Sequence, residues 1–114
     1  MGTSIILGQG YVGLPLAQAL TEIGDEVLGF DVNQSLVDRL NDGKSHVDDI
    51  SDSSLALMIK SGYRATTAPQ DIGLADVVVI CVPTPLDSHG GPDMSYVESA
   101  SALVAANLKP GALV

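Results

Sequence analysis

The chain has 114 residues, a length that allows one domain and not two. Hydrophobic residues make up 46% of the sequence and charged residues 17%, a globular composition that argues against disorder. The formal net charge of −9 repels phosphate backbones and anionic lipids, so it disfavours nucleic acid and membrane surfaces as partners.

The first half of the chain predicts two strands, each followed by a helix. Short apolar runs at residues 3–7 and 26–32 predict the strands. Apolar residues at helical spacing follow each run, and Gly24 and Gly43 end the two patterns. The helical spacing is carried by Val12, Leu16, Leu20 and Ile23, and then by Leu36, Val37 and Leu40.

The middle of the chain continues the alternation. A polar loop at residues 44–51 leads to a third helix, which carries Leu55, Met58 and Ile59 and ends at Gly62. Residues 63–67 alternate weakly and predict an edge strand. Residues 77–82 are apolar without interruption, which predicts a strand buried on both faces, as at the centre of a parallel sheet.

The last part predicts a loop, a helix and the beginning of a strand. After a proline-rich loop at residues 83–94, Ser95 and Glu98 match a capping box. That helix carries Val97, Ala100, Val104 and Leu108. Residues 112–114 resemble the start of a fifth strand. Because a mean strand has about five or six residues, we expect the chain to be part of a longer protein.

Alternating strands and helices predict an α/β fold, a doubly wound parallel sheet with right-handed crossovers, that is, a Rossmann fold. We expect the strand order 3-2-1-4-5, interrupted in or after the fifth strand, and one domain over residues 1–114. Ligands bind such sheets at the carboxyl ends of the strands, beside the switch point between strands 1 and 4. Val82, Pro83 and Thr84 are expected at that crevice.

The segment at residues 8–13, GQGYVG, fits the pattern G-x-G-x-x-G between a predicted strand and a predicted helix, the context that indicates dinucleotide binding. Gly8 would make the tight turn and Gly10 would let the backbone approach a diphosphate. Gly13 would let the helix pack against the strand. The alternative is a tight strand–helix turn without a ligand.

The amides near Tyr11 and Val12 begin the helix, so they are unpaired donors at its positive dipole end. They form an anion site without a cation, which suits residues 1–21, where no side chain is charged at pH 7.

Asp31 lies 18 residues beyond Gly13, at the end of the second predicted strand. A carboxylate there accepts hydrogen bonds from the hydroxyls of the adenosine ribose. The same carboxylate would repel a 2′-phosphate, and residues 32–38 contain no Lys or Arg to offset that repulsion. The sequence therefore predicts NAD rather than NADP. The alternative is a helix-capping or turn aspartate.

Four segments together resemble the UDP-glucose/UDP-N-acetylmannosamine 6-dehydrogenase family, and the resemblance runs essentially from end to end. They are residues 8–15 (GQGYVGLP), 29–33 (GFDVN), 81–86 (CVPTPL) and 92–100 (PDMSYVESA). The last is closer to the UDP-N-acetylmannosamine branch. The resemblance implies the N-terminal NAD-binding domain of an oxidoreductase of nucleotide sugar metabolism and polysaccharide biosynthesis. Such enzymes oxidise the C6 alcohol of a UDP-sugar to a carboxylate, using two NAD and a covalent cysteine intermediate.

The resemblance also implies roles for residues of this chain. The backbone at Tyr11 and Val12 would contact the diphosphate, Asp31 the ribose, and Thr84 the cofactor near its nicotinamide half. The expected cofactor-binding residues are Gly8, Gly10, Tyr11, Val12, Gly13, Asp31, Val82, Pro83 and Thr84.

Two departures from the family pattern matter. Leu36 stands where many members carry a basic residue, which implies a lower affinity for NAD. The family's catalytic residues lie beyond the matched region, so we expect no catalytic residue and no turnover in this chain. The UDP-sugar would bind through other domains, and the whole protein is expected to be a homo-oligomer.

Other polar residues are interpreted as structural. Cys81 lies in a predicted buried strand, where a thiol without an activating partner stays inert. Two His/Asp groups lie in polar loops without metal-ligand spacing, so we expect solvated loops and no metal. These groups are His46 with Asp48 and Asp49, and His89 with Asp87 and Asp93. A single cysteine, no cationic leader and no apolar run of membrane-spanning length favour the cytoplasm.

Two alternative functions remain open on the residues alone. One is the N-terminal domain of a 3-hydroxyacid dehydrogenase, which shares the glycine loop and an apolar fourth strand. The other is a regulatory NAD-sensing module without chemistry, because one fold hosts many functions. The segments at residues 81–86 and 92–100 favour the nucleotide-sugar dehydrogenase.

Overall fold

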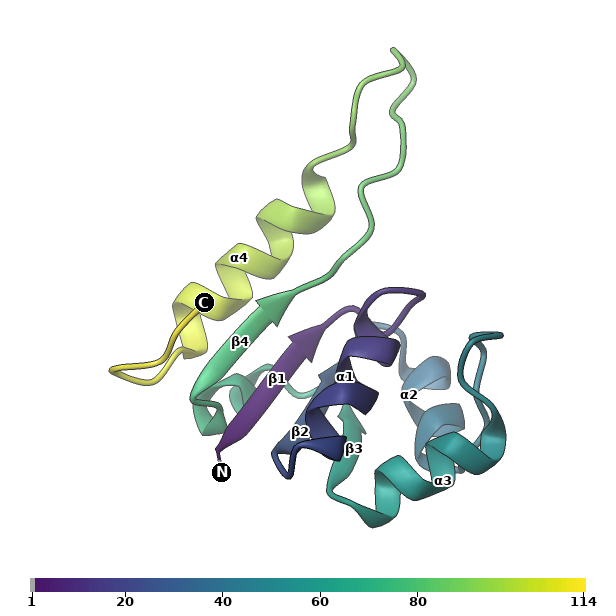
Figure 1. Cartoon of the computed structure of the whole chain (residues 1–114). Helices are drawn as coiled ribbons and strands as arrows, with labels where there is room; N and C mark the ends of the chain where they lie inside the picture. The colour runs from purple at the N-terminus through teal and green to yellow at the C-terminus, as the bar shows by residue number, and fades with distance from the viewer. Residues whose placement is uncertain (1) are drawn as a thin grey trace.

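The computed structural model of the chain describes residues 2–114; Met1, the first residue of the predicted domain, lies outside them. Four parallel strands lie side by side in the order β3-β2-β1-β4 (Figure 1). They are β1 (Thr3–Leu7), β2 (Glu26–Phe30), β3 (Tyr63–Thr66) and β4 (Val77–Ile80). The helices are α1 (Gly13–Glu22), α2 (Gln34–Asn41), α3 (Asp52–Lys60), the 3-10 helix η1 (Pro69–Leu74) and α4 (Ser95–Asn107). The α/β class and the first four positions of the predicted order are confirmed.

The fifth position of the sheet is marked by a single parallel bridge between Val77 and Leu113. The N–H of Val78 donates to the carbonyl of Leu113 at 2.7 Å, and the N–H of Leu113 donates to the carbonyl of Asp76 at 2.9 Å. Leu113 therefore lies beside β4, where the predicted strand order puts a fifth strand.

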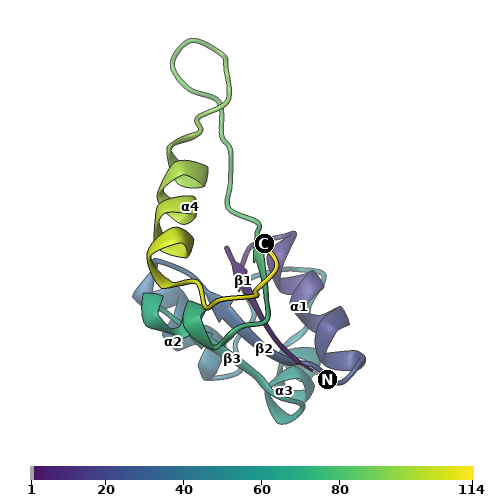
Figure 2. The ribbon, with the colours of Figure 1, turned by 90° about the vertical axis from the view of Figure 1, so that its left-hand side faces the viewer.

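Two apolar cores cover the two faces of the sheet, because neighbouring residues of a strand point to opposite faces. On one face, Ile6 of β1 packs with side chains of α1, α2 and α3. On the other face, Ile5 and Leu7 pack with η1 and α4. The loop between β4 and α4 projects away from the sheet in both views (Figures 1 and 2). This two-sided cover is the doubly wound arrangement.

The predicted core face of the first helix is wrong at its two ends, whereas Leu16 and Leu20 are partly buried against the core. Val12 and Ile23 are 69% and 68% exposed, and the buried residues of α1 are Gly13, Leu14, Ala17 and Thr21. A Cβ on Gly13 would overlap the carbonyl oxygen of Gly8, so the glycine face approaches β1 most closely. That contact turns Leu14 and Ala17 toward the sheet and leaves the predicted stripe at its border.

The predicted two-sided burial of residues 77–82 is also wrong. β4 ends at Ile80, and of its four residues only Val78 is buried. The reason is that β4 pairs fully with β1 on one side, whereas its outer edge meets only the bridge at Leu113. Similarly, β2 ends at Phe30 rather than at residue 32, because Asp31 turns toward the glycine loop.

Local details at the helix ends differ from the predicted capping. Ser95 is the first residue of α4 and not its cap, and its N–H donates to Asp93 Oδ1 at 2.9 Å. The predicted capping box is therefore replaced by Asp93, which lies one residue before the N-cap position, Met94. The 3-10 helix η1 was not predicted, because its six residues are too few for a periodic signal.

Candidate functional site

The glycine loop joins β1 to α1, and two of its three glycines are explained by packing. Gly8 has a φ of +96°, and a Cβ there would lie 2.6 Å from the carbonyl oxygen of Cys81. Gly13 has no room for a Cβ beside Gly8. Gly10 differs, because no heavy atom lies within 4 Å of the place its Cβ would take. Open space at Gly10 is what a backbone that must approach a ligand requires.

The amino end of α1 carries unpaired main-chain donors. The helical pattern begins when the N–H of Leu14 donates to the carbonyl of Gly10 at 3.1 Å. Among residues 2–114, the N–H groups of Tyr11, Val12 and Gly13 have no acceptor, and Val12, the N-cap residue, makes no side-chain cap. Such amides, at the positive end of a helix dipole, favour an anion.

Asp31 is held in place by two main-chain amides. Its Oδ2 accepts from the N–H of Gln9 at 3.1 Å, and its Oδ1 accepts from the N–H of Asn33 at 3.1 Å. The second bond is the local turn that the alternative interpretation expected. The first ties the end of β2 to the glycine loop. Because each carboxylate oxygen has two lone pairs, Asp31 keeps acceptor capacity for a ligand.

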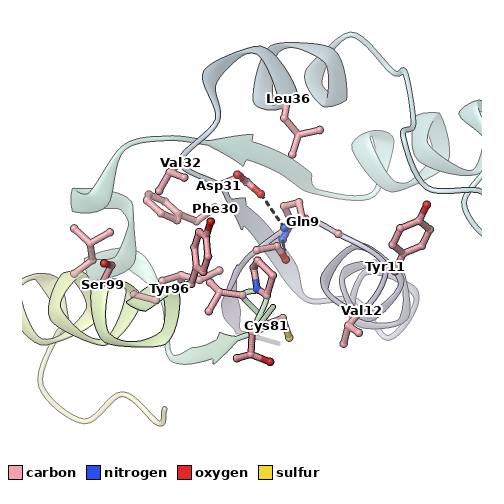
Figure 3. Close-up of a pocket in the computed structure, with 18 of the residues that line it drawn as sticks. Gln9, Tyr11, Val12, Phe30, Asp31, Val32, Leu36, Cys81, Tyr96 and Ser99 are labelled. Carbon is pink, nitrogen blue, oxygen red and sulfur yellow. Dashed lines mark hydrogen bonds between the residues drawn. The ribbon is translucent and has the colours of Figure 1, made fainter. Parts of the chain in front are cut away.

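These groups line one pocket of about 800 Å³ at the carboxyl ends of β1, β2 and β4. In Figure 3 the Gln9–Asp31 hydrogen bond lies between Tyr11 and Val12 on one side and Tyr96 and Ser99 of α4 on the other. The size suits a ligand of dinucleotide class, since small-molecule pockets span roughly 300–1,000 Å³.

The structure brings all but one of the predicted cofactor-binding residues to this pocket. Its lining contains Gly8, Gly10, Tyr11, Val12, Asp31, Val82, Pro83 and Thr84. Gly13 is not in the lining, because it lies buried at the contact between α1 and the loop. Eight of the nine residues thus line one pocket, and their role in binding a cofactor stays a prediction.

Other residues of the pocket lining are not predicted as binding residues by the sequence. They include Phe30 and Val32 at the end of β2, His46, and Tyr96, Ser99, Ala100 and Leu103 of α4. The side chains of α4 come more than 60 residues after Asp31 in the chain, and no local pattern links them to the glycine loop. Only the packing of α4 against the sheet reveals this wall.

Two interpretations of single residues need correction. Cys81 follows β4 instead of lying inside it and is half-buried in the pocket wall; burial raises the pKa of its thiol. His46 is not solvated: it is half-buried and also lines the pocket, and its Nδ1 is buried without a partner in the described part of the chain. The reason is that the neighbouring Val47 and Ile50 belong to the core and hold this loop against the protein.

The charge of the pocket wall bears on the choice of ligand. Asp31 supplies the carboxylate of the pocket lining, and the lining contains no Lys or Arg. A terminal phosphate monoester beside Asp31 would therefore meet a negative charge without a guanidinium or ammonium group to offset it. A diphosphate at the amides of α1 meets only neutral donors.

Residues 2–114 contain neither a cluster of metal-ligating side chains nor a membrane-spanning helix. No three His, Cys, Asp or Glu side chains gather in a way that could hold a metal ion. No helix among the described residues is long and apolar enough to cross a membrane. His89, Asp87 and Asp93 form the second His/Asp group considered in the sequence. Asp87 Oδ1 accepts hydrogen bonds from the main-chain N–H groups of His89 and Gly91, and these bonds close the tip of the projecting loop.

Comparison with known proteins gives a consistent result. Residues 3–114 match the model of the UDP-glucose/GDP-mannose dehydrogenase family, NAD binding domain. The chain is 41% identical to a UDP-N-acetyl-D-mannosamine dehydrogenase of Salmonella typhi, over 98% of the chain and 26% of that protein. It is 42% identical to an NDP-N-acetyl-D-galactosaminuronic acid dehydrogenase of Ralstonia nicotianae, with the same two coverages. The chain thus spans about a quarter of the length of these relatives.

Solved structures agree with these matches. A UDP-D-ManNAc dehydrogenase from Pyrococcus horikoshii superposes with a TM-score of 0.91 at 34% identity, over 98% of this chain and 27% of that one. A (S)-3-hydroxybutyryl-CoA dehydrogenase from Ralstonia eutropha superposes with a TM-score of 0.62 at 18% identity, over 96% of this chain and 38% of that one. The second likeness is one of fold alone.

Proposed function

Because the chain belongs to the UDP-glucose/GDP-mannose dehydrogenase family, as its NAD binding domain, we propose that it binds NAD in the pocket at the carboxyl ends of β1, β2 and β4. The backbone at Gly10, Tyr11 and Val12 binds the diphosphate, and Asp31 binds the hydroxyls of the adenosine ribose. Val82, Pro83 and Thr84 lie along the nicotinamide half.

The observation that carries this proposal is that unpaired main-chain amides and an oriented carboxylate line the same pocket. The unpaired N–H groups of Tyr11 and Val12 favour an anion, whereas Asp31 favours neutral hydroxyl donors. NAD presents both features in one molecule, a diphosphate next to a ribose with two free hydroxyls. NADP replaces one of those hydroxyls by a phosphate, which the carboxylate repels. We therefore propose a preference for NAD.

Titration calorimetry with NAD and NADP tests this assignment. Asp31→Ala should weaken NAD binding about tenfold or more, because charge-assisted hydrogen bonds are worth about 1.5–3 kcal/mol each. Asp48→Ala is the matched control, since it removes the same charge from an exposed position outside the pocket lining. An Asp31→Ala variant that is folded and binds NAD as tightly as the control would refute the assignment.

For the whole protein we propose oxidation of the C6 alcohol of a UDP-sugar to a carboxylate, with UDP-N-acetylmannosamine or a similar nucleotide sugar as substrate. NAD, when bound, accepts a hydride. Oxidation of an alcohol to a carboxylate removes four electrons, so two NAD are needed per sugar. The names of the relatives in two organisms, a UDP-N-acetyl-D-mannosamine and an NDP-N-acetyl-D-galactosaminuronic acid dehydrogenase, support the substrate class.

We propose that the residues that perform this chemistry lie outside these 114 residues. The chain spans 26% of its relatives, and the free cysteine in its pocket wall, Cys81, has a raised pKa, which disfavours the nucleophilic thiolate. The chain alone should bind NAD without reducing it. The whole protein should form two NADH per UDP-sugar consumed; an NAD-sensing module would form none, and a 3-hydroxyacid dehydrogenase would act on acyl substrates instead.

Two further expectations remain proposals. A single free cysteine favours a reducing compartment, and we place the protein in the cytoplasm. On the family resemblance, we also propose that the whole protein is a homo-oligomer. On the net charge of −9, we propose that nucleic acid is not a partner.

A further inference from the structure

Gln9 is a residue of the glycine loop whose side chain is buried. The side chain is 0% exposed, although the neighbouring Tyr11 and Val12 are each 69% exposed. Its Nε2 donates to the carbonyl of Ile6 at 2.9 Å and to that of Gly8 at 3.2 Å. The amide thus fastens the loop from below to the end of β1.

The remaining acceptor of this amide is satisfied from the far edge of the sheet. Gln9 Oε1 accepts a hydrogen bond from the hydroxyl of Tyr63 at 2.7 Å, across 54 positions of sequence. Tyr63 lies in β3, and β2 runs between β3 and β1. Burial, and next the charge of Asp31, raise the pKa of the Tyr63 hydroxyl, which therefore stays neutral and can donate.

The two side chains meet over β2 because Gly29 leaves a gap there. A Cβ on Gly29 would overlap both Gln9 Oε1 and the hydroxyl oxygen of Tyr63. Gly29 pairs with Ile6 of β1 on one side and with Ala65 of β3 on the other. The missing side chain of Gly29 therefore leaves space over one face of β2, and the Gln9–Tyr63 hydrogen bond occupies that space.

Gln9 also connects this space to the ligand side of the loop, because its main-chain N–H donates to Asp31 Oδ2 at 3.1 Å (Figure 3). We propose that Tyr63 is a positioning residue of the dinucleotide site: by holding the Gln9 side chain, it fixes the main-chain N–H that orients the Asp31 carboxylate. This inference rests on the proposed function. It assigns a role in cofactor binding to a side chain outside the pocket lining.

The physical reason is the cost of a buried acceptor without a donor. If Tyr63 loses its hydroxyl, Gln9 Oε1 stays fully buried and unpaired, so the amide gains by turning away. Turning moves the backbone between Gly8 and Gly10, and with it the N–H that holds Asp31.

The test is a set of NAD titrations, with thermal unfolding recorded for each variant. Tyr63→Phe should weaken NAD binding about threefold to tenfold. When Asp31 is already replaced by Ala, adding Tyr63→Phe should change NAD affinity less than twofold, because the group that it orients is gone.

Asn41→Ala supplies the control for a merely structural role. Asn41 is an exposed residue of α2 whose side chain exchanges two hydrogen bonds with the backbone of Ala65 in β3, at 2.9 and 3.0 Å. Its loss destabilises the same strand without touching Gln9, so NAD affinity should stay unchanged. If Asn41→Ala weakens NAD binding as much as Tyr63→Phe does, the effect is one of strand stability and the inference is wrong.

Failure of this inference can be told apart from failure of the proposed function. If the unaltered protein binds no NAD, both are overturned. If it binds NAD and depends on Asp31, but Tyr63→Phe binds equally tightly, only the positioning role is overturned. A Tyr63→Phe effect that persists in full in the Asp31→Ala background also overturns it.

Discussion

Alanine substitutions at Gly10 and Gly13 should have opposite consequences, although both glycines belong to one motif. Gly10 lies in the lining of the pocket, and nothing within 4 Å would meet its Cβ. Gly13 lies buried between the loop and α1, where a Cβ would overlap the carbonyl oxygen of Gly8. We therefore expect Gly10→Ala to impair binding only, and Gly13→Ala to impair folding.

The expected sizes follow from these surroundings. Gly10 does not have a positive φ, so alanine fits its backbone and should leave stability unchanged or raise it by about 0.4–1 kcal/mol. The new methyl group would stand between the main chain and a diphosphate, and loss of one charge-assisted hydrogen bond weakens binding about tenfold to a hundredfold. Gly13→Ala should cost about 3 kcal/mol or more, because backbone cannot move aside as a side chain can.

Urea denaturation and NAD titration of the two variants together decide the matter. Gly10→Ala should unfold at the urea concentration of the unaltered protein, or above it, and bind NAD poorly. Gly13→Ala should unfold at a clearly lower concentration. A Gly10→Ala variant with unchanged NAD affinity would show that no ligand approaches that backbone. A Gly13→Ala variant of normal stability would mean that α1 does not pack on the loop as described.

Two further predictions concern titratable groups. Hydrogen bonds from Lys109 Nζ at 2.6 Å and from the N–H of Thr3 at 3.0 Å lower the pKa of Asp76. The stability that the ionised Asp76 contributes is therefore present above the ordinary carboxyl pKa of 3.8, and it is lost as the pH falls below 3.8. Asp76→Ala should therefore be less stable than the unaltered protein at pH 7, and thermal unfolding between pH 2 and pH 7 should show the difference shrinking in acid; an equal difference at both ends contradicts this. Burial raises the pKa of the Cys81 thiol, so a disulfide reagent at pH 8 should react with it more slowly in the folded protein than in urea; equal rates would mean an open, unperturbed thiol.

The sequence alone determined the class of fold and the chemistry of the loop. Apolar runs separated by helical spacing located strands and helices to within a few residues at β1, β2 and α3, because the hydrophobicity of a residue and the period of the backbone are local properties. The motif of Gly8, Gly10 and Gly13 and its spacing to Asp31 are also local in sequence, and Gly8, Gly10 and Asp31 lie in the lining of one pocket.

Errors appeared where neighbours in space set the outcome. The buried face of α1 depends on how closely Gly13 approaches Gly8, and the exposure of β4 depends on what pairs with its outer edge. The predicted solvation of His46 was wrong because Val47 and Ile50 anchor its loop in the core. None of these contacts has a periodic signal in the chain.

Only the tertiary structure decided how the glycine loop is held. Tyr63, Gln9 and Gly29 come from three different elements, and each is unremarkable in its own segment. Parallel pairing of β1, β2 and β3 brings them together over β2, where the missing Cβ of Gly29 leaves room for a hydrogen bond between the other two. The local sequence determines which side chains each segment carries. The register of the sheet determines which of these side chains come within hydrogen-bond distance, because that distance depends on how neighbouring strands are aligned.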